Sequence, residues 1–462
     1  MRTALSEESM HSINEALSRA NRETASTYPG ETASRQPVHT VYGGAHLFRA
    51  DTAQRLGALA LRSLEQFAPD AATLARATAM FDGHDSNDAK RDSRATLTET
   101  IYARVSEKLR REPVEDFRID FEDGYGNRPD AEEDGHAESA ATQVAAGLKD
   151  GTLPPFIGIR IKPFNEELRA RSVRTLDIFL STLVERCEGT LPPNFVVTLP
   201  KITASAQVSA LADIYDLLEP QLGLTAGALK FEMMIETTQS IISAEGEIAL
   251  PRLLRAARGR CTAAHFGTYD YTAACQITAA HQHMLHPVCD FAKHMMQVSF
   301  AGTGVWLSDG ATNIMPVAPH RAAEGTELSP EQLEENTRTV QRAWRLHFEH
   351  VRHSLTNGFY QGWDLHPAQL PTRYSAVYSF FLESLDAASE RLRNFVEKAA
   401  KATLVGDVFD DAATGQGLLN YFLRATNCGA ITEAEATRLS GLTPEELRSG
   451  SFVRILNGRQ NS

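Results

Sequence analysis

Short apolar runs rich in β-branched and aromatic residues alternate with longer Ala- and Leu-rich stretches along most of the chain. From the second run to the seventh, the runs begin 33 to 39 residues apart. Strand–helix alternation at this spacing is typical of βα units that build a parallel sheet. Eight runs predict a (β/α)8 TIM barrel, and they cover residues 39–48, 117–122, 156–161, 195–201, 229–236, 262–268, 296–307 and 358–366.

The segments outside this rhythm predict the domain organisation. Residues 1–36 are polar and are expected to form an N-terminal extension. The barrel is expected over 37–400, with helical insertions near 49–116 and 310–357. A C-terminal helical segment is expected over 401–462.

Local signals define some of the helices. Ser329 and Gln332 form a capping-box pattern at the start of a helix predicted over 331–353. A long helix is expected at about 375–402, after the eighth strand. The TPEE segment at 443–446 predicts the start of the last helix, because proline favours the first helical position.

Composition and charge narrow the class of protein. The chain has 462 residues, of which 42% are hydrophobic, 8% aromatic and 23% charged, and these values are typical of a globular protein. Lysine and arginine total 46 and aspartate and glutamate 59, which gives a net charge of −13. A surface this acidic repels phosphate backbones and anionic lipids, so we expect neither nucleic-acid nor membrane binding.

The cysteines and the N-terminus bear on location. The five cysteines are widely spaced and include no CxxC pair, which argues against a disulfide framework and for a reducing compartment. The first residues contain no apolar stretch typical of a signal peptide. We therefore expect a cytoplasmic protein.

Ionisable residues gather where seven of the eight predicted strands end. In a parallel barrel the chemistry lies at these C-terminal ends. Buried ion pairs that fill the barrel are the structural alternative, but they seldom repay their desolvation. The residues concerned are Asp120, Glu122, Asp123, Arg160, Lys162, Lys201, Glu232, Glu236, Asp270, Asp309, Asp364 and His366.

This set predicts a particular chemistry. Several carboxylates with few soft ligands suit Mg²⁺ or Mn²⁺ better than zinc. A metal that grips the carboxylate and keto oxygens of a 2-oxo acid acts as a Lewis acid and template. A nearby arginine can then stabilise an enolate or alkoxide oxygen, so the set indicates carbon–carbon bond chemistry through an enolate.

Several short motifs occur in one order along the chain: DFED (120–123), GIRIKPFN (158–165), LPK (199–201), MIET (234–237), FGTYDY (266–271) and WDLHPAQ (363–369). In this order they resemble the HpcH/HpaI aldolase / citrate lyase beta-subunit superfamily of the phosphoenolpyruvate/pyruvate barrels. DDAAT (410–414) resembles the malate synthase motif that carries the catalytic base. Strand 7 (GTGVWLSDG) and Tyr269 depart from the malate synthase pattern and leave any use of coenzyme A open.

The resemblance implies roles for individual residues. Glu236 and Asp270, with Glu122, would hold the metal. The resemblance also implies Asp411 as the base, Arg160, Asp120 and Asp123 as further catalytic residues, and Arg160, Lys201, Gly267 and His366 as substrate-binding residues. Asp309 is a further catalytic candidate because it lies where the seventh strand is expected to end. A homo-oligomer is also expected from the resemblance alone.

Three functions follow from these observations. The leading hypothesis is a Mg²⁺- or Mn²⁺-dependent carbon–carbon lyase or aldolase that acts on a small 2-oxo or hydroxy acid. The second is a malate synthase-like enzyme that condenses a coenzyme A thioester with a 2-oxo acid. The third is a barrel without activity that binds a metabolite.

Overall fold

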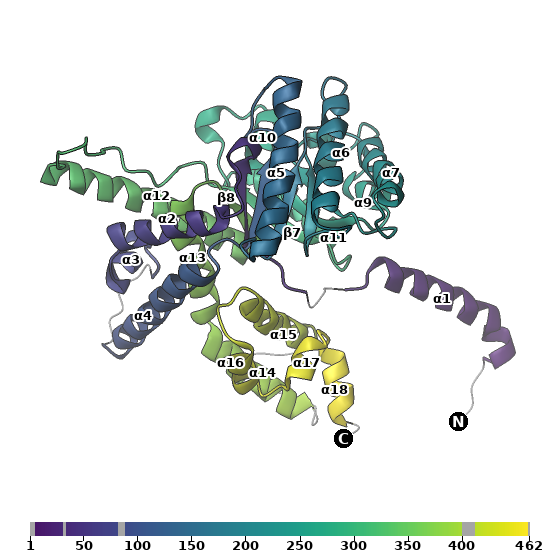
Figure 1. Ribbon diagram of the computed structural model, residues 1–462. Helices are drawn as coiled ribbons and strands as arrows, with labels where there is room; N and C mark the ends of the chain where they lie inside the picture. The colour runs from purple at the N-terminus through teal and green to yellow at the C-terminus, as the bar shows by residue number, and fades with distance from the viewer. Residues whose placement is uncertain (1–4, 31–33, 82–87, 400–411, 461–462) are drawn as a thin grey trace.

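Eight parallel strands close into a barrel in sequence order in the computed structural model, which describes residues 5–30, 34–81, 88–399 and 412–460 (Figure 1). The predicted TIM-barrel fold is therefore confirmed. The strands are β1 (His39–Gly44), β2 (Asp116–Asp120), β3 (Phe156–Arg160), β4 (Phe195–Leu199), β5 (Phe231–Ile235), β6 (Cys261–Phe266), β7 (Trp306–Ala311) and β8 (Gln361–Asp364).

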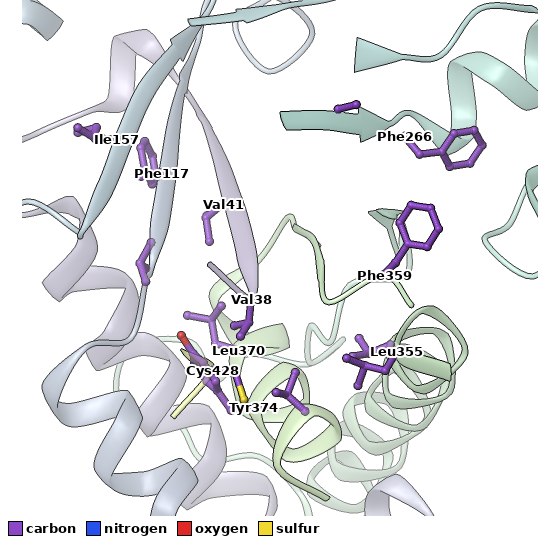
Figure 2. Packing of buried hydrophobic residues seen from close by; sticks show 14 of the residues in the cluster. Val38, Val41, Phe117, Ile157, Phe266, Leu355, Phe359, Leu370, Tyr374 and Cys428 are labelled. Atoms are coloured by element: carbon purple, nitrogen blue, oxygen red, sulfur yellow. The ribbon is translucent and has the colours of Figure 1, made fainter. Parts of the chain in front are cut away.

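The strands carry apolar residues outward and polar residues inward, because successive side chains of a strand point to opposite faces. Outward residues such as Phe117 and Ile157 are buried beneath the surrounding helices. Figure 2 shows these two side chains on neighbouring strands, with Leu370 and Tyr374 in the same apolar cluster. The hydrophobic core is thus the layer between barrel and helices, and the barrel interior holds charged groups together with aromatic rings.

Helices surround the barrel and fill both predicted insertions. They are α2 (Thr52–Phe67), α3 (Ala71–Thr78), α4 (Asp88–Arg111), α5 (Asp130–Asp150), α6 (Arg169–Arg186), α7 (Ser205–Gln221), α8 (Thr238–Ile241), α9 (Leu250–Ala256), α10 (Thr268–Ala274), α11 (Pro287–Phe300), α12 (Pro330–Thr356) and α13 (Leu370–Leu382). The described residues also contain short 3-10 helices: η1 (Ala45–Leu47), η2 (Ala279–His281) and η3 (Pro367–Gln369). The capping box of Ser329 and Gln332 is present at the start of α12, as the sequence predicts.

The seventh strand lies later in the chain than the apolar run suggests. The first part of the run, 296–300, belongs to the end of α11, and β7 begins only at Trp306. Gly302 and Gly304 both have positive φ and turn the chain between the two elements. The prediction failed there because a buried helix end and a buried strand are equally apolar.

The helices at the two ends of the chain lie apart from the barrel. Helix α1 (Glu7–Thr27) stands away from the body (Figure 1). The prediction of a single long helix at 375–402 is wrong, because α13 ends at Leu382 and a new helix follows. The C-terminal helices are α14 (Leu385–Ala399), α15 (Ala412–Asn427), α16 (Glu433–Ser440), α17 (Pro444–Arg448) and α18 (Phe452–Gln460), so α17 is not the last helix as expected.

Helix α14 packs against α15 and α16 rather than along the barrel (Figure 1). Arg424 of α15 donates a hydrogen bond to Gln36, which lies just before β1. The C-terminal helices therefore attach at the end of the barrel where the strands begin. Throughout the described ranges, no helix is long and apolar enough to cross a membrane.

Candidate active site at the mouth of the barrel

Five carboxylates and two cations meet where the strands end, at what we call the mouth of the barrel. They come from the ends of β2 and β3, from the loops after β2, β4 and β5, and from the first turn of α10. We call this set the mouth cluster: Asp120, Glu122, Asp123, Arg160, Lys201, Glu236 and Asp270.

The Asp120–Arg160 pair organises one side of the mouth cluster. Arg160 Nε donates to Asp120 Oδ1 at 2.7 Å, and the Gly124 N–H donates to Asp120 Oδ2 at 2.7 Å. Arg160 Nη1 lies 3.1 Å from Glu122 Oε2. The guanidinium also lies over the Tyr42 ring, 4.9 Å from its centroid. Arg160 is therefore fixed in one orientation, with Nη1 directed at the acidic side of the cluster.

Glu236 forms the opposite side. Its carboxylate is buried, and Oε1 accepts a hydrogen bond from the backbone N–H of Lys201 at 2.7 Å. Gly267 lies against the other oxygen, and a Cβ at this position would stand 2.6 Å from Glu236 Oε2. A glycine is required here because any side chain would push the carboxylate out of place.

Lys201 connects the two sides. Its Nζ contacts Glu122, lies 3.2 Å from Asp123 Oδ1 and 3.7 Å from Asp270 Oδ1. Its φ of 50° places the residue in the left-handed region, which is uncommon outside glycine and is a form of local strain often found at functional sites.

The mouth cluster holds more negative than positive charge. Burial and the nearby Asp270 raise the pKa of Glu236 to about 8. Burial also raises the pKa of Glu122 to about 7, although Arg160 opposes the shift. Burial would lower the pKa of Lys201, but Glu236 and Glu122 together raise it above its ordinary value. An additional cation would therefore stabilise the cluster.

The donors fit a hard divalent cation. Glu236, Asp270 and Glu122 offer only carboxylate oxygens, which Mg²⁺ and Mn²⁺ prefer. Within the described part of the chain, no three His, Cys, Asp or Glu side chains are already arranged about one point as metal ligands. Instead, the carboxylates of Glu122, Asp123 and Asp270 face the Lys201 ammonium.

A second polar group lies deeper in the barrel, and we call it the deep network: Asp116, Arg118, Glu232 and His265. Arg118 is fully buried; its Nη2 lies 2.7 Å from Asp116 Oδ2 and 2.9 Å from Glu232 Oε1. Thr40 donates to Asp116. Thr198 donates to Glu232.

The deep network is the buried ion pair that the sequence left as an alternative. Although burial alone would raise it, Arg118 and His265 lower the pKa of Glu232 to about 2. Burial, together with the Glu232 charge, raises the pKa of Asp116. Glu232 is therefore a structural partner of Arg118 and lies below the mouth cluster.

Three residues expected at the mouth face the surrounding helices instead. Asp309 is buried, accepting from Lys293 of α11 at 3.0 Å and from Ser354 of α12 at 2.7 Å. Asp364 pairs with Arg373. Lys162 pairs with Glu133 of α5. The expectation that Asp309, Asp364 and Lys162 lie at the mouth is corrected, because each points out of the barrel.

The two remaining candidates are His366 and Asp411. His366 precedes η3, and its Nδ1 accepts the Ala368 N–H at 3.2 Å, so it caps that turn. Asp411, the expected base, lies outside the described residues. Helix α15, which begins at Ala412, contacts the barrel near Gln36, at the end opposite the mouth.

Aromatic residues that the sequence analysis did not select line the barrel beneath the cluster. The Tyr42 and Trp363 rings lie 4.6 Å apart, and the Tyr42 hydroxyl and Trp363 Nε1 are buried without a partner in the described structure. The sequence signal that could have identified Tyr42 is its position in the first strand, where Thr40, Tyr42 and Gly44 share one face. Both groups are donors available to a ligand or an ordered water.

Fold and site together define a barrel of the kind that carries its chemistry at the C-terminal ends of its strands. Residues 17–455 match the family described as a domain of unknown function (DUF6986), and the chain belongs to that family. A comparison of the sequence with curated proteins finds no match.

Solved structures of two enzyme types are similar to this chain. A citrate lyase from Burkholderia xenovorans LB400 is 18% identical, with a TM-score of 0.52 over 73% of this chain and 92% of that chain. A Haloferax volcanii malate synthase in a magnesium/glyoxylate complex is 12% identical, with a TM-score of 0.44 over 91% and 96%. A citrate lyase beta subunit from M. tuberculosis, complexed with oxaloacetate and magnesium, is 15% identical, with a TM-score of 0.37 over 74% and 97%. At these identities the likeness to the Burkholderia protein establishes a shared fold.

Proposed function

We propose that the protein is a carbon–carbon lyase or aldolase that requires Mg²⁺ or Mn²⁺ and acts on a small 2-oxo or hydroxy acid. The observation that carries this proposal is the convergence of Glu236, Asp270 and Arg160 at one end of the barrel. The shared fold with a citrate lyase agrees with carbon–carbon bond chemistry.

The metal ligands in this proposal are Glu236 and Asp270, with Glu122 as a third. A bound divalent cation would supply a Lewis acid for the oxygens of a 2-oxo acid and for the enolate. Burial of the Glu236 carboxylate and its hydrogen bond from Lys201 hold one ligand in position without the cation.

Arg160 is the residue we assign to the developing negative charge. A guanidinium is always charged and offers a rigid fork of donors. Asp120 occupies one edge of that fork, which leaves Nη1 toward the carboxylates of Glu122 and Asp123. From this position Arg160 can donate to a substrate oxygen and balance charge as the bond breaks or forms.

The test is a substrate screen with the full chain. Panels of 2-oxo acids, hydroxy acids, aldehydes and acetyl-CoA are incubated with Mg²⁺ or Mn²⁺, and products are followed by mass spectrometry. We expect turnover that EDTA abolishes and that Asp270→Asn lowers ~10²-fold or more. Asp213→Asn, which alters an exposed carboxylate of α7, is the matched control and should retain full turnover.

The screen also separates the rival functions. Products that require acetyl-CoA would assign the protein to the condensing enzymes, with Asp411 as the base to be tested next. Ligand binding without turnover in any panel would assign it to the metabolite-binding barrels. Full turnover of Asp270→Asn in EDTA would exclude the metal-dependent mechanism.

A further inference from the structure

We propose that the Lys201 ammonium holds the cation position of the mouth cluster in the metal-free protein and competes with the divalent cation for it. The inference rests on the proposed function in one respect, since it takes Glu236 and Asp270 as ligands of that cation. It assigns Lys201 a regulatory role: the residue sets the affinity of the site for metal.

The Lys201 ammonium lies among carboxylates of the mouth cluster. Lys201 Nζ contacts Glu122 and lies 3.2 Å from both oxygens of Asp123 and 3.7 Å from Asp270 Oδ1. These carboxylates come from the loop after β2 and from α10, so the ammonium lies between two separate segments of the mouth. A divalent ion bound by Asp270 would lie close to this ammonium, and two cations at such a distance repel strongly in a partly buried site.

The backbone of Lys201 is held by a hydrogen bond, while its side chain is partly exposed. The Lys201 backbone N–H donates a hydrogen bond to Glu236 Oε1 at 2.7 Å, and the main chain has a φ of 50° at this position. The side chain has a flexible four-carbon stem and is 28% exposed. The ammonium can therefore leave the carboxylates without disturbing the hydrogen bond that orients Glu236.

Charge balance explains why the site would keep such a group. Five carboxylates face two cations, so three negative charges are unmatched when all are ionised. The ammonium limits this repulsion until a divalent ion arrives with twice the charge. Once displaced toward the exposed Asp123, it lies at the entrance, where it can meet the carboxylate of an incoming acid.

The experiment measures Mn²⁺ affinity of the full chain by electron paramagnetic resonance and calorimetry. Lys201→Met removes the ammonium and keeps the backbone donor and much of the side-chain volume. We expect Mn²⁺ to bind Lys201→Met roughly tenfold or more tightly than wild type, because a competing charge is gone. The metal-free variant should also melt at a lower temperature than metal-free wild type, and saturating Mn²⁺ should close that gap.

Lys230→Met is the matched control. Lys230 precedes β5 at the opposite end of the barrel, where its Nζ donates to the Gly259 carbonyl. The same loss of one positive charge there should leave Mn²⁺ affinity within about twofold of wild type, since the distance exceeds a Debye length at physiological salt. An equal gain in both variants would show a general charge effect and overturn the inference.

Two outcomes distinguish this inference from the proposed function. If Asp270→Asn loses Mn²⁺ while Lys201→Met binds it no more tightly than wild type, the metal site stands and the competition is refuted. If Mn²⁺ binds neither wild type nor Lys201→Met, there is no metal site, and both proposals fall. Tight binding by Lys201→Met alone supports both, with Lys201 as the barrier to metal.

Discussion

Glu232 lies on the inward face of β5, and Glu236 follows the end of the same strand four residues later. The two carboxylates nevertheless have electrostatically opposite surroundings. Glu232 lies in the deep network, where Arg118 pairs with it, Thr198 donates a hydrogen bond to it and His265 Nε2 lies 3.3 Å from its Oε1. Burial of the Glu232 carboxylate would raise its pKa, but Arg118 lowers the pKa to about 2. Glu236 is buried as well, but Asp270 lies near it and its pKa is raised to about 8.

The contrast separates groups that hold the barrel together from groups that are available for chemistry. In the deep network, two carboxylates share one arginine, and each also accepts a hydrogen bond from a threonine hydroxyl. In the mouth cluster, carboxylates outnumber cations, and the structure holds them together against their mutual repulsion. Perturbed pKa values of this kind cluster at functional sites. Four predictions test the contrast.

The largest effect should come from Arg118→Met in the deep network. The variant leaves Asp116 and Glu232 buried without their shared partner, which costs about 3–5 kcal/mol in the free energy of unfolding. Chemical denaturation measures the loss. A loss below about 1 kcal/mol would mean that the deep network does not stabilise the barrel, and the contrast would break.

Glu236→Gln in the mouth cluster should behave in the reverse way. We expect Mn²⁺ binding to disappear and turnover to fall ~10²-fold or more, equivalent to about 3 kcal/mol. In EDTA the melting temperature should be unchanged or higher, because the amide carries no charge to be repelled by Asp270. A large drop in the metal-free melting temperature would instead make Glu236 structural.

Asp309→Asn tests the residue that faces the helices instead of the mouth. The variant weakens the pairing of buried Lys293 and the hydrogen bond from Ser354. We expect a loss of about 1–3 kcal/mol in the free energy of unfolding, typical of an impaired buried polar group. Turnover per folded molecule should stay within about threefold of wild type, well short of the loss of an acid–base group; a fall of ~10²-fold would return Asp309 to the catalytic residues.

The smallest effect is a pH dependence in the metal-free protein. The pKa of Glu236 is raised from 4.5 to about 8, so its contribution to stability is full below pH 4.5 and is lost as the pH rises through 8. The contribution of Glu232 is present above pH 4.5 and is lost as the pH falls through 2. In EDTA, wild type should therefore lose stability relative to Glu236→Gln between pH 5 and pH 8, by roughly 1 kcal/mol or more. A difference independent of pH would contradict the assignment.

The sequence was sufficient to predict the barrel and the residues of the mouth cluster. The βα rhythm predicts eight parallel strands, and residues that end neighbouring strands must meet at one edge. Seven predicted residues are brought together there: Asp120, Glu122, Asp123, Arg160, Lys201, Glu236 and Asp270. The deep network could not be predicted from the sequence, because the pairing of Arg118 with Glu232 depends on how β2 and β5 face each other across a closed barrel.

The wrong predictions for Asp309 and Lys162 have a common physical origin: the alternation of residues along a strand does not define the direction of either side chain. Asp309 stands between Ser308 and Gly310, so no apolar–polar alternation defines which face its side chain takes. Only the contacts with Lys293 and Ser354 settle that it points to the helices. Lys162 follows the end of β3, where the period of two no longer applies.

The attachment of the C-terminal helices near Gln36 has a practical consequence. Helix α1 leads into the same end of the barrel, so both outer helical segments join the body on the side away from the mouth cluster (Figure 1). An affinity tag, a fluorophore or a surface tether placed on either segment leaves the mouth cluster uncovered. The molecule can thus be immobilised in a defined orientation, with the mouth cluster directed to solution, for measurements of ligand binding and of the proposed turnover.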